Sequence, residues 1–277
     1  MTMDLKQALK GRLKPEEIPL VSKSFDIVGD IGIIELDESL KKKERAVAEA
    51  LMRVHRHIKT VCAKSGERGG RLRLRKLEKV MGNGFETVHT ESGCRYKLDV
   101  RKAYFSPRES TERKRVADQV KAGETVLVMF SGIAPYAVMI AKTQKGVEKV
   151  SCIELNRDAC RYAEENVKMN KVADKIEIIC GDVGEESKRF RGLFDRVVMP
   201  APTEAYRYLD DAVACVKNGG VVHFYFIGHE DDLYSECEDL VRESCGEVGK
   251  KFKILRRKKV LPYAPRIWKV CLDVEVR

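Results

Sequence analysis

The chain lacks the features that would place it in a membrane, outside the cell or around a metal cluster. No apolar run approaches the roughly 20 residues that a membrane-spanning helix needs. Residues 1–10 alternate in charge and contain no apolar stretch typical of a secretion signal. The nine cysteines are scattered and include no C-x-x-C pair, so we expect neither a disulfide framework nor a metal site. These absences predict a cytoplasmic protein that has no membrane partner.

The basic charge is concentrated in one part of the chain. With 277 residues, 43% of them hydrophobic, the chain can form two domains with real cores. Residues 41–121 contain 23 Lys or Arg against 10 Asp or Glu, whereas the net charge of the whole chain is only +10. A basic segment beside a slightly acidic remainder favours a nucleic-acid backbone as partner. The alternative is a highly charged surface of the kind that stabilises thermophilic proteins.

Residues 1–100 are predicted to form a small α+β domain. The pattern indicates a helix over 39–58 and strands at 25–28, 31–36, 60–63, 87–91 and 95–99. Ser92-Gly93 lies between the last two strands, which predicts a hairpin. Residues 65–70 have the composition of a glycine-rich basic loop. In residues 71–75 arginine alternates with leucine, so the arginines would share one face of a strand.

In residues 101–277 the pattern changes to alternating strands and helices. We expect helices at 110–121, 134–144, 157–169, 203–217 and 231–245, between strands at 125–130, 149–154, 176–180, 195–199 and 220–226. Such alternation predicts an α/β fold, a Rossmann-like and mostly parallel sheet with right-handed crossovers. Strands at 252–260 and 268–276 would close the sheet as an antiparallel edge.

Three of these predicted strands end in residues suited to a nucleotide cofactor. The first is followed by Ser131-Gly132-Ile133-Ala134-Pro135, and a glycine there lets the backbone approach a ligand. Glu154 ends the second strand, where its carboxylate could accept both ribose hydroxyls. Asp182 follows the third, where a carboxylate could meet an adenine amino group. The glycine alone is as typical of an ordinary turn, but the three strand ends together favour a cofactor.

Glu112 is a candidate general base because it is a carboxylate set among arginines. Arg108 precedes it and Arg113-Lys114-Arg115 follows. Developing negative charge would need a guanidinium, which Arg73, Arg75 or Arg108 could supply. From the residues alone, capping and pairing on a helix is the better interpretation of Glu112. Tyr104-Phe105 could stack on an unpaired base or pack in a core. The seven basic residues of 250–259 predict a solvated face that assists RNA binding.

Taken together, these segments resemble the archaeal and eukaryotic tRNA (guanosine-37) N1-methyltransferases. The resemblance covers about residues 20–277 and is carried by Phe25–Asp30, Arg71–Glu78, Tyr104–Arg113, Met129–Pro135, Ile153–Asn156, Asp195–Pro202, His223–Gly228 and Tyr263–Arg266. It implies a class I methyltransferase domain over 101–277 with S-adenosylmethionine as cofactor. It also implies that residues 1–100 are an RNA-binding domain for the anticodon stem-loop of tRNA.

The same resemblance assigns roles to individual residues. Glu112 matches the base that takes the proton from guanine N1, and Arg73 matches the arginine that stabilises charge on O6. The cofactor residues that it implies are Phe130, Gly132, Pro135, Glu154, Asn156 and Asp182. Those implied for the substrate or RNA are Arg75, Tyr104, Arg108, Arg113, Pro200 and Pro202.

This chain departs from the family pattern in the cofactor loop and at the substrate site. Val128 and Ala134 replace an Asp and a Gly of the loop, Glu154 replaces an Asp, and Pro200 replaces the Asn whose amide orients the guanine. Two alternatives follow. One is aminocarboxypropyl transfer in wybutosine synthesis, whose enzymes have Gly-His where this chain has Ala134-Pro135. The other is a non-catalytic RNA-binding protein. We favour methyl transfer because this chain lacks that Gly-His, and we expect a monomer. DNA is disfavoured as the substrate because an N-P-P-Y-like base clamp is absent.

Overall fold

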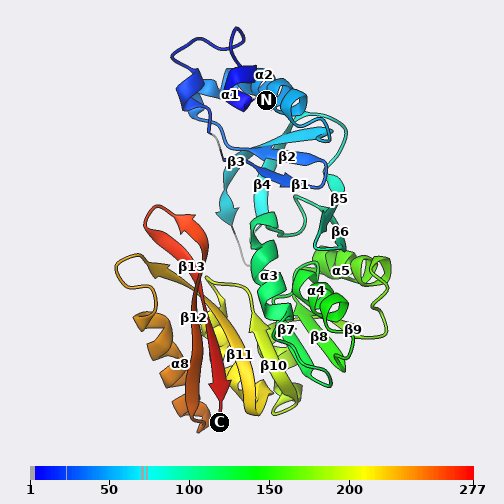
Figure 1. Ribbon diagram of the computed structural model, residues 1–277, viewed down its shortest axis with the longest axis vertical. Helices are drawn as coiled ribbons and strands as arrows, with labels where there is room; N and C mark the ends of the chain where they lie inside the picture. Colours follow the sequence, from blue (N-terminus) through cyan, green and yellow to red (C-terminus); the bar gives the residue numbers. More distant parts are fainter. Residues whose placement is uncertain (1–3, 23, 70–71, 73) are drawn as a thin grey trace. The chain divides into compact units, whose positions relative to one another are not determined.

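Two compact units, residues 1–107 and 108–277, make up the computed structural model of the chain (Figure 1). It describes residues 4–22, 24–69, 72 and 74–277. The division between the units falls between Pro107 and Arg108, a few residues beyond the boundary expected at residues 100 and 101. Each unit has its own sheet and its own core.

The smaller unit contains a four-stranded sheet of order β1-β2-β3-β4 and a separate hairpin, β5–β6. Its elements are α1 (Leu5–Ala8), β1 (Asp26–Val28), β2 (Ile31–Ile34), α2 (Glu44–Val54), β3 (Thr60–Gly69), β4 (Leu74–Met81), β5 (Glu86–Glu91) and β6 (Cys94–Asp99), with 3₁₀ helices at Ile18–Leu20 and Glu38–Lys43. The prediction of a loop at residues 65–70 is wrong for residues 65–69, which belong to a strand. β3 continues to Gly69 and pairs with β4 across an irregularity between Lys64 and Arg68. The predicted arginine face at Arg71 and Arg73 lies outside the described residues.

Local sequence explains how this smaller unit folds. Val47 and Leu51 stand one helical turn apart on α2 and are fully buried, and they pack in one core with Ile34 and Val61 of the sheet. Ser92 and Gly93 both have positive φ, 46° and 74°, which is the backbone of a type I′ turn. The hairpin predicted around them is therefore confirmed.

The larger unit is built on a seven-stranded sheet of order β12-β13-β11-β10-β7-β8-β9. Its strands are β7 (Thr125–Met129), β8 (Lys149–Glu154), β9 (Ile176–Cys180), β10 (Phe194–Met199), β11 (Val216–His229), β12 (Phe252–Ala264) and β13 (Ile267–Val276). Its helices are α3 (Ser110–Ala117), α4 (Pro135–Thr143), α5 (Arg157–Met169), α6 (Val183–Glu186), α7 (Leu209–Cys215) and α8 (Ser235–Val248), with 3₁₀ helices at Pro107–Glu109, Ser187–Phe190 and Ala205–Tyr208. The limits of β8, α5 and β9 match the prediction residue for residue, whereas α6 was not predicted.

The order of the strands confirms the doubly wound, mostly parallel sheet. β7 to β11 are parallel, and β13 runs antiparallel between β11 and β12. The chain leaves β7 toward β8 and β9, then returns to β10 on the other side of β7. This reversal makes a topological switch point, and ligands of such sheets bind at the carboxyl ends of the strands beside it. We call that side of the sheet its carboxyl edge.

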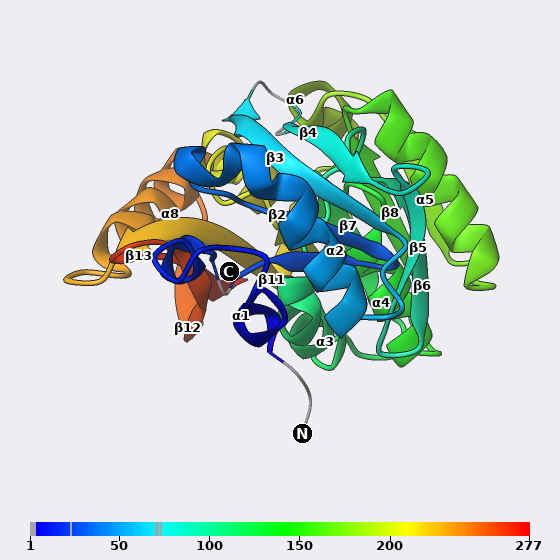
Figure 2. The same cartoon turned by 90° about the horizontal axis from the view of Figure 1, so that it is seen from above.

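Helices cover both faces of this sheet, as Figure 2 shows for α3 and α8. Alternation along β11 decides which residue faces which side. Val222, Phe224 and Phe226 share a hydrophobic core with residues of α7 and α8. His223 and Tyr225 face the other way, toward α3, where they meet polar partners. The α3 face of the sheet therefore carries a cluster of buried polar side chains.

All nine cysteines are free thiols, and eight of them are buried. The exception is Cys180, which is exposed at the end of β9. Among the described residues, no helix is both long enough and apolar enough to cross a membrane.

Candidate active site

The loop between β7 and α4 has an unusual backbone at the switch point. Phe130, Gly132 and Ala134 all have positive φ, at 55°, 56° and 63°, so every second residue is left-handed. Hydrogen bonds hold this shape: Ser131 N–H donates to the Ile153 carbonyl at 3.0 Å, and Asn166 Nδ2 donates to the Ile133 carbonyl at 3.2 Å. Pro135 then starts α4 at a position where no backbone donor is needed. The result is a rigid, close turn at the carboxyl edge.

Ala134 stands where the family pattern has glycine, and it takes the backbone conformation that glycine favours. Its φ of 63° and ψ of 37° are left-handed, which costs an alanine about 1–2 kcal/mol. The methyl group is fully buried, and burial of one methyl recovers about 0.8 kcal/mol. The replacement of glycine therefore leaves the fold of the loop intact.

Glu154 holds this loop from the end of β8. Its Oε2 accepts the N–H of Gly132 at 2.7 Å, and its Oε1 accepts the N–H of Asn156 at 2.8 Å. Burial raises the pKa of Glu154, against the opposing effect of these backbone donors. The N–H of Leu155 is a third backbone donor to this carboxylate. Because a carboxylate has about four acceptor positions, one is left for a further donor, and Glu154 fits the sugar hydroxyls of a nucleoside cofactor.

Asn156 and Asp182 are helix caps on the same edge of the sheet. The side chain of Asn156 accepts from the N–H groups of Asp158 and Ala159 and begins α5. Asp182 accepts from the N–H of Gly184 at 2.9 Å and begins α6, directly after β9. Asn156 thus acts on the site through its backbone N–H to Glu154. Asp182 is placed at the third strand end, as the sequence predicts.

Glu112 is buried in α3 and ion-paired, with 4% of its surface exposed. Arg115, one turn further on, donates from Nη2 to Oε1 at 2.7 Å and from Nε to Oε2 at 2.8 Å. The hydroxyl of Tyr225 on β11 also donates to Oε1, at 2.6 Å. Oε2 accepts one hydrogen bond in the described part of the chain and so keeps a lone pair for a proton. Of the basic run expected around Glu112, Arg115 is its partner.

A second buried ion pair lies beside Pro200 at the end of β10. Lys269 of β13 donates to Glu109 at 2.9 Å and to the carbonyl oxygen of Pro200 at 3.3 Å. Both charged side chains are at least 93% buried. Pro200 has no amide to offer, but its carbonyl is held in place by a lysine. Pro202 is buried two residues later.

Of the two arginines in this unit that the sequence predicts to contact RNA, one is exposed and the other is buried. Arg108 is exposed before α3. Arg113 is only 2% exposed, so the structure does not present it to RNA in the way that the sequence predicts.

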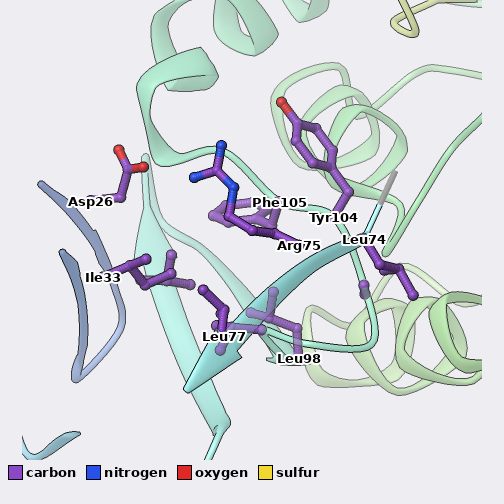
Figure 3. A pocket seen from close by; sticks show the side chains of 11 residues that line it. Asp26, Ile33, Leu74, Arg75, Leu77, Leu98, Tyr104 and Phe105 are labelled. Atoms are coloured by element: carbon purple, nitrogen blue, oxygen red, sulfur yellow. The ribbon is translucent and has the colours of Figure 1, made fainter. Parts of the chain in front are cut away.

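In the smaller unit, Arg75 and Tyr104 line a cavity of about 40 Å³ together with Asp26 (Figure 3). The polar groups of these three lie toward one end of the cavity, and Ile33, Leu77 and Leu98 line the other. Phe105 packs against His89 and Tyr96 at ring distances of 5.1 Å and 5.6 Å, which favours core packing for this aromatic residue. Arg73 lies outside the described residues.

Four residues beside Glu112 and Arg115 have no role that the sequence predicts. Tyr225, Lys269, Asp273 and His223 gather on the α3 face from two strands, β11 and β13. Their only signal is a polar residue at every second position of two otherwise apolar strands. His223, Cys271 and Asp273 also bring potential metal-ligand atoms within 4.8 Å of one another. Arg115 donates to Asp273 and to the sulfur of Cys271, and Arg196 donates to His223. Such neighbouring guanidinium groups disfavour a cation there.

A sheet of this order, with a tight loop after β7 and acidic residues at the ends of β8 and β9, is the architecture of a class I S-adenosylmethionine-dependent methyltransferase, and the comparisons with known proteins agree. The model of the TRM5/TYW2 methyltransferase domain matches residues 87–255, and that of the TYW2 N-terminal domain matches residues 5–85. The chain belongs to this TRM5/TYW2 family.

Named relatives show which activities occur in proteins similar to this chain. The tRNA (guanine(37)-N(1))-methyltransferase Trm5b of Pyrococcus abyssi is 38% identical over 91% of this chain and 74% of its own length. A tRNA(Phe) (4-demethylwyosine(37)-C(7)) aminocarboxypropyltransferase of Pyrococcus horikoshii is 30% identical over 98% of this chain and 96% of its own length. In the solved complex of aTrm5 and tRNALeu, the protein chain is 30% identical in sequence to this chain, and the two superpose with a TM-score of 0.88. The match covers 100% of this chain and 79% of that one.

Proposed function

We propose that this protein transfers a methyl group from S-adenosylmethionine to N1 of guanosine 37 in tRNA. The observation that carries the proposal is the pairing of Glu154 with the left-handed loop at Gly132 in a chain of the TRM5/TYW2 family. The P. abyssi relative named for this reaction supports it further. The partner is tRNA rather than DNA, and we expect a monomer in the cytoplasm.

The residues of the carboxyl edge would hold the cofactor. Glu154 would accept the ribose hydroxyls, Asp182 would meet the adenine amino group, and the loop from Phe130 to Pro135 would approach the cofactor with its backbone. When bound, S-adenosylmethionine supplies an electrophilic methyl group. Guanine N1 carries a proton at neutral pH, so a base must remove it. Glu112 would take this proton on Oε2, the oxygen that keeps a lone pair.

Recognition of RNA would fall to basic and aromatic residues of both units. Arg73 would stabilise negative charge on guanine O6, and Arg75, Tyr104 and Arg108 would contact the base or the RNA backbone. Pro200 and Pro202 would shape the substrate site, with the Pro200 carbonyl held by Lys269. The excess of basic residues in 41–121 supports a role of the smaller unit in binding the anticodon stem-loop.

The test is the identity of the modified nucleoside. The protein is incubated with S-adenosylmethionine and an unmodified tRNA transcript that has guanosine at position 37. The tRNA is then digested, and the nucleosides are identified by chromatography and mass spectrometry. We expect 1-methylguanosine, which should be absent when guanosine 37 is replaced by adenosine. Cofactor binding is measured in parallel by calorimetry. Bound cofactor and bound tRNA without a modified nucleoside would support a non-catalytic RNA-binding protein instead.

Aminocarboxypropyl transfer is a second candidate that one observation favours. The smaller unit matches the TYW2 N-terminal domain, and the P. horikoshii aminocarboxypropyltransferase aligns over nearly its whole length. The discriminating substrate is tRNA that carries 4-demethylwyosine at position 37. Addition of a 3-amino-3-carboxypropyl group to that tRNA, with no modification of the guanosine 37 transcript, would establish aminocarboxypropyl transfer in place of methyl transfer.

A further inference from the structure

One guanidinium group joins the two carboxylates of the α3 face. Arg115 binds Glu112 through two hydrogen bonds, and it also donates to Asp273 from Nη1 at 2.6 Å and from Nη2 at 3.1 Å. Only 13% of the Arg115 side chain is exposed, and 2% of that of Asp273. Competition between the two acids for a single cation is therefore weakly screened by water. Glu112 shares its counter-ion.

The chain of contacts continues from Asp273 across the sheet. Asp273 Oδ1 accepts from His223 Nδ1 at 2.6 Å, and His223 Nε2 lies 2.7 Å from Arg196 Nη1. Arg196 then pairs with Glu124 at 2.9 Å, next to the amino end of β7. All of these groups belong to the larger unit, and His223 is completely buried. The result is a continuous line of polar contacts from Glu112 to Glu124.

His223 is neutral in this line of contacts. An arginine can only donate, so His223 Nε2 must accept and the ring proton sits on Nδ1. Burial lowers the pKa of His223, against the raising effect of Asp273, in agreement with a neutral ring. The line then contains three carboxylates, from Glu112, Asp273 and Glu124, and two guanidinium groups, from Arg115 and Arg196. One negative charge is left in excess.

Two of the three carboxylates in this line are firmly paired. Burial would raise the pKa of Asp273, but hydrogen bonds and charges from His223 and Arg115 outweigh it and hold that pKa well below the ordinary value. Asp273 therefore stays ionised and keeps its hold on Arg115. Glu124 has Arg196 as its own partner through two hydrogen bonds. Glu112 is left with a shared cation and one open lone pair.

We propose that Asp273 and Arg115 are positioning residues, which fix the carboxylate of Glu112 and set how readily it takes up a proton. Because the Arg115 guanidinium also pairs with Asp273, it stabilises the Glu112 anion less than an unshared arginine would. Glu112 can therefore still accept a proton while it is ion-paired. This inference rests on the proposed function, in which Glu112 removes the N1 proton. It assigns a role to two residues that lie 158 positions apart in the chain.

Titratable and charged groups lie near Glu112 on every neighbouring element. They are Arg113 and Arg115 on α3, Glu109 in the preceding 3₁₀ helix, Tyr136 on α4, Tyr225 on β11, and Lys269, Cys271 and Asp273 on β13. Tyr225 is the only one besides Arg115 with a hydrogen bond to Glu112 among the described residues. Its removal is thus the mildest direct perturbation of the carboxylate.

The experiment compares the pH dependence of three variants with the full-length wild type. Single-turnover rates are measured with tRNA and S-adenosylmethionine between pH 5 and 9, so that product release does not mask the chemical step. Asp273→Asn should move the acid limb of the profile to lower pH, since Arg115 is no longer shared. Arg115→Gln and Tyr225→Phe should move it to higher pH, because each loses a donor to the anion. We expect shifts of about one pH unit.

A second readout keeps the proposal testable without turnover. Proton uptake by Glu112 is followed by ¹³C NMR of glutamate-labelled protein, with Glu112→Gln to assign the signal. The same opposite shifts are expected there. Wild type without any 1-methylguanosine would refute the proposed function, while the NMR titration would still decide on the positioning role.

The matched control is Lys114→Gln, next to Arg115 on α3, whose ion pair is with Asp118. It should leave both profiles unchanged. A purely structural network would lower the stability of the variants, measured by urea unfolding, without moving either midpoint. Unmoved midpoints, or shifts of Asp273→Asn and Arg115→Gln in the same direction, would overturn the proposal. If Arg115→Gln fails to fold, the opposite shifts expected of Asp273→Asn and Tyr225→Phe decide.

Discussion

Glu154 Oε2 accepts a hydrogen bond from the backbone of Gly132 at 2.7 Å, so the end of β8 holds the loop that follows β7. The residue proposed to bind the ribose is thus also the one that shapes the loop around the cofactor. A change in the charge of the Glu154 carboxylate should therefore also change the shape of the loop.

Replacement of Glu154 by glutamine tests this coupling. The amide keeps one acceptor but turns a donor toward either the Gly132 or the Asn156 N–H, so one of these bonds is lost. We expect at least a tenfold loss of affinity for S-adenosylmethionine, since hydrogen bonds to a charged group contribute about 1.5–3 kcal/mol. Calorimetric titration measures it. Glu177→Gln, an exposed change on the adjacent strand, is the control and should bind like wild type.

The raised pKa of Glu154 also predicts how cofactor binding depends on pH. The ribose hydroxyls need the ionised carboxylate, so affinity should be full at neutral pH and fall as the pH drops toward the raised pKa. The effect on stability has the opposite sign. Because folding favours the protonated form, this group stabilises the fold most at low pH, and that contribution is lost as the pH rises through the raised pKa. An affinity that stayed constant down to pH 4.5 would contradict the assignment.

Glu112→Gln should remove most turnover and leave cofactor affinity unchanged. Glutamine preserves the volume of the buried side chain but cannot take up the N1 proton, and loss of a general base costs about 10²–10⁴-fold in rate. The rate is measured as single-turnover formation of 1-methylguanosine. Asp118→Asn, at the exposed end of the same helix, should retain the wild-type rate. Unchanged turnover in Glu112→Gln would remove this residue from the mechanism.

A row of basic residues on β12 extends the α3 face to the outer strand of the sheet. Lys253, Arg256 and Lys258 pair in register with Glu275, Asp273 and Cys271, and opposite residues of an antiparallel pair point to the same face. All three are exposed and none forms an ion pair within the described residues. Arg257, between them, points to the other face and pairs with Glu238. The row is therefore available for phosphates.

Removal of the row should weaken tRNA binding mainly through electrostatics. For the triple change Lys253→Gln, Arg256→Gln and Lys258→Gln we expect the slope of log affinity against log salt to fall by about 2–3, near one per lost phosphate contact. Filter binding between 50 and 300 mM salt measures this slope. A triple glutamine variant at the exposed Lys121, Lys145 and Lys168 is matched in charge. Equal slopes for the two triple variants would show that the row does not contact RNA.

The sequence predicts where the candidate cofactor residues lie in the fold, because their positions depend on local structure. Strand periodicity places Gly132, Glu154 and Asp182 at successive strand ends, and a parallel sheet brings successive strand ends to one edge. The surroundings of the proposed general base, Glu112, depend instead on contacts between residues far apart in the chain. Arg115 meets Asp273 only because β13 inserts antiparallel beside β11, and a one-residue change of register would turn Asp273 to the α8 face. Such pairings depend on tertiary register, which periodicity alone leaves open.

The left-handed backbone at Ala134 gives a prediction about stability that contact counting would miss. Ala134→Gly releases about 1–2 kcal/mol of strain, but it loses about 0.8 kcal/mol of methyl burial and adds about 0.5–1 kcal/mol of chain entropy. We therefore expect its free energy of unfolding to lie close to that of wild type. Ala137→Gly, one turn into α4 and equally buried, has no strain to release and should lose about 2 kcal/mol. Urea unfolding of the two variants measures the difference, and equal losses would mean that Ala134 is not strained.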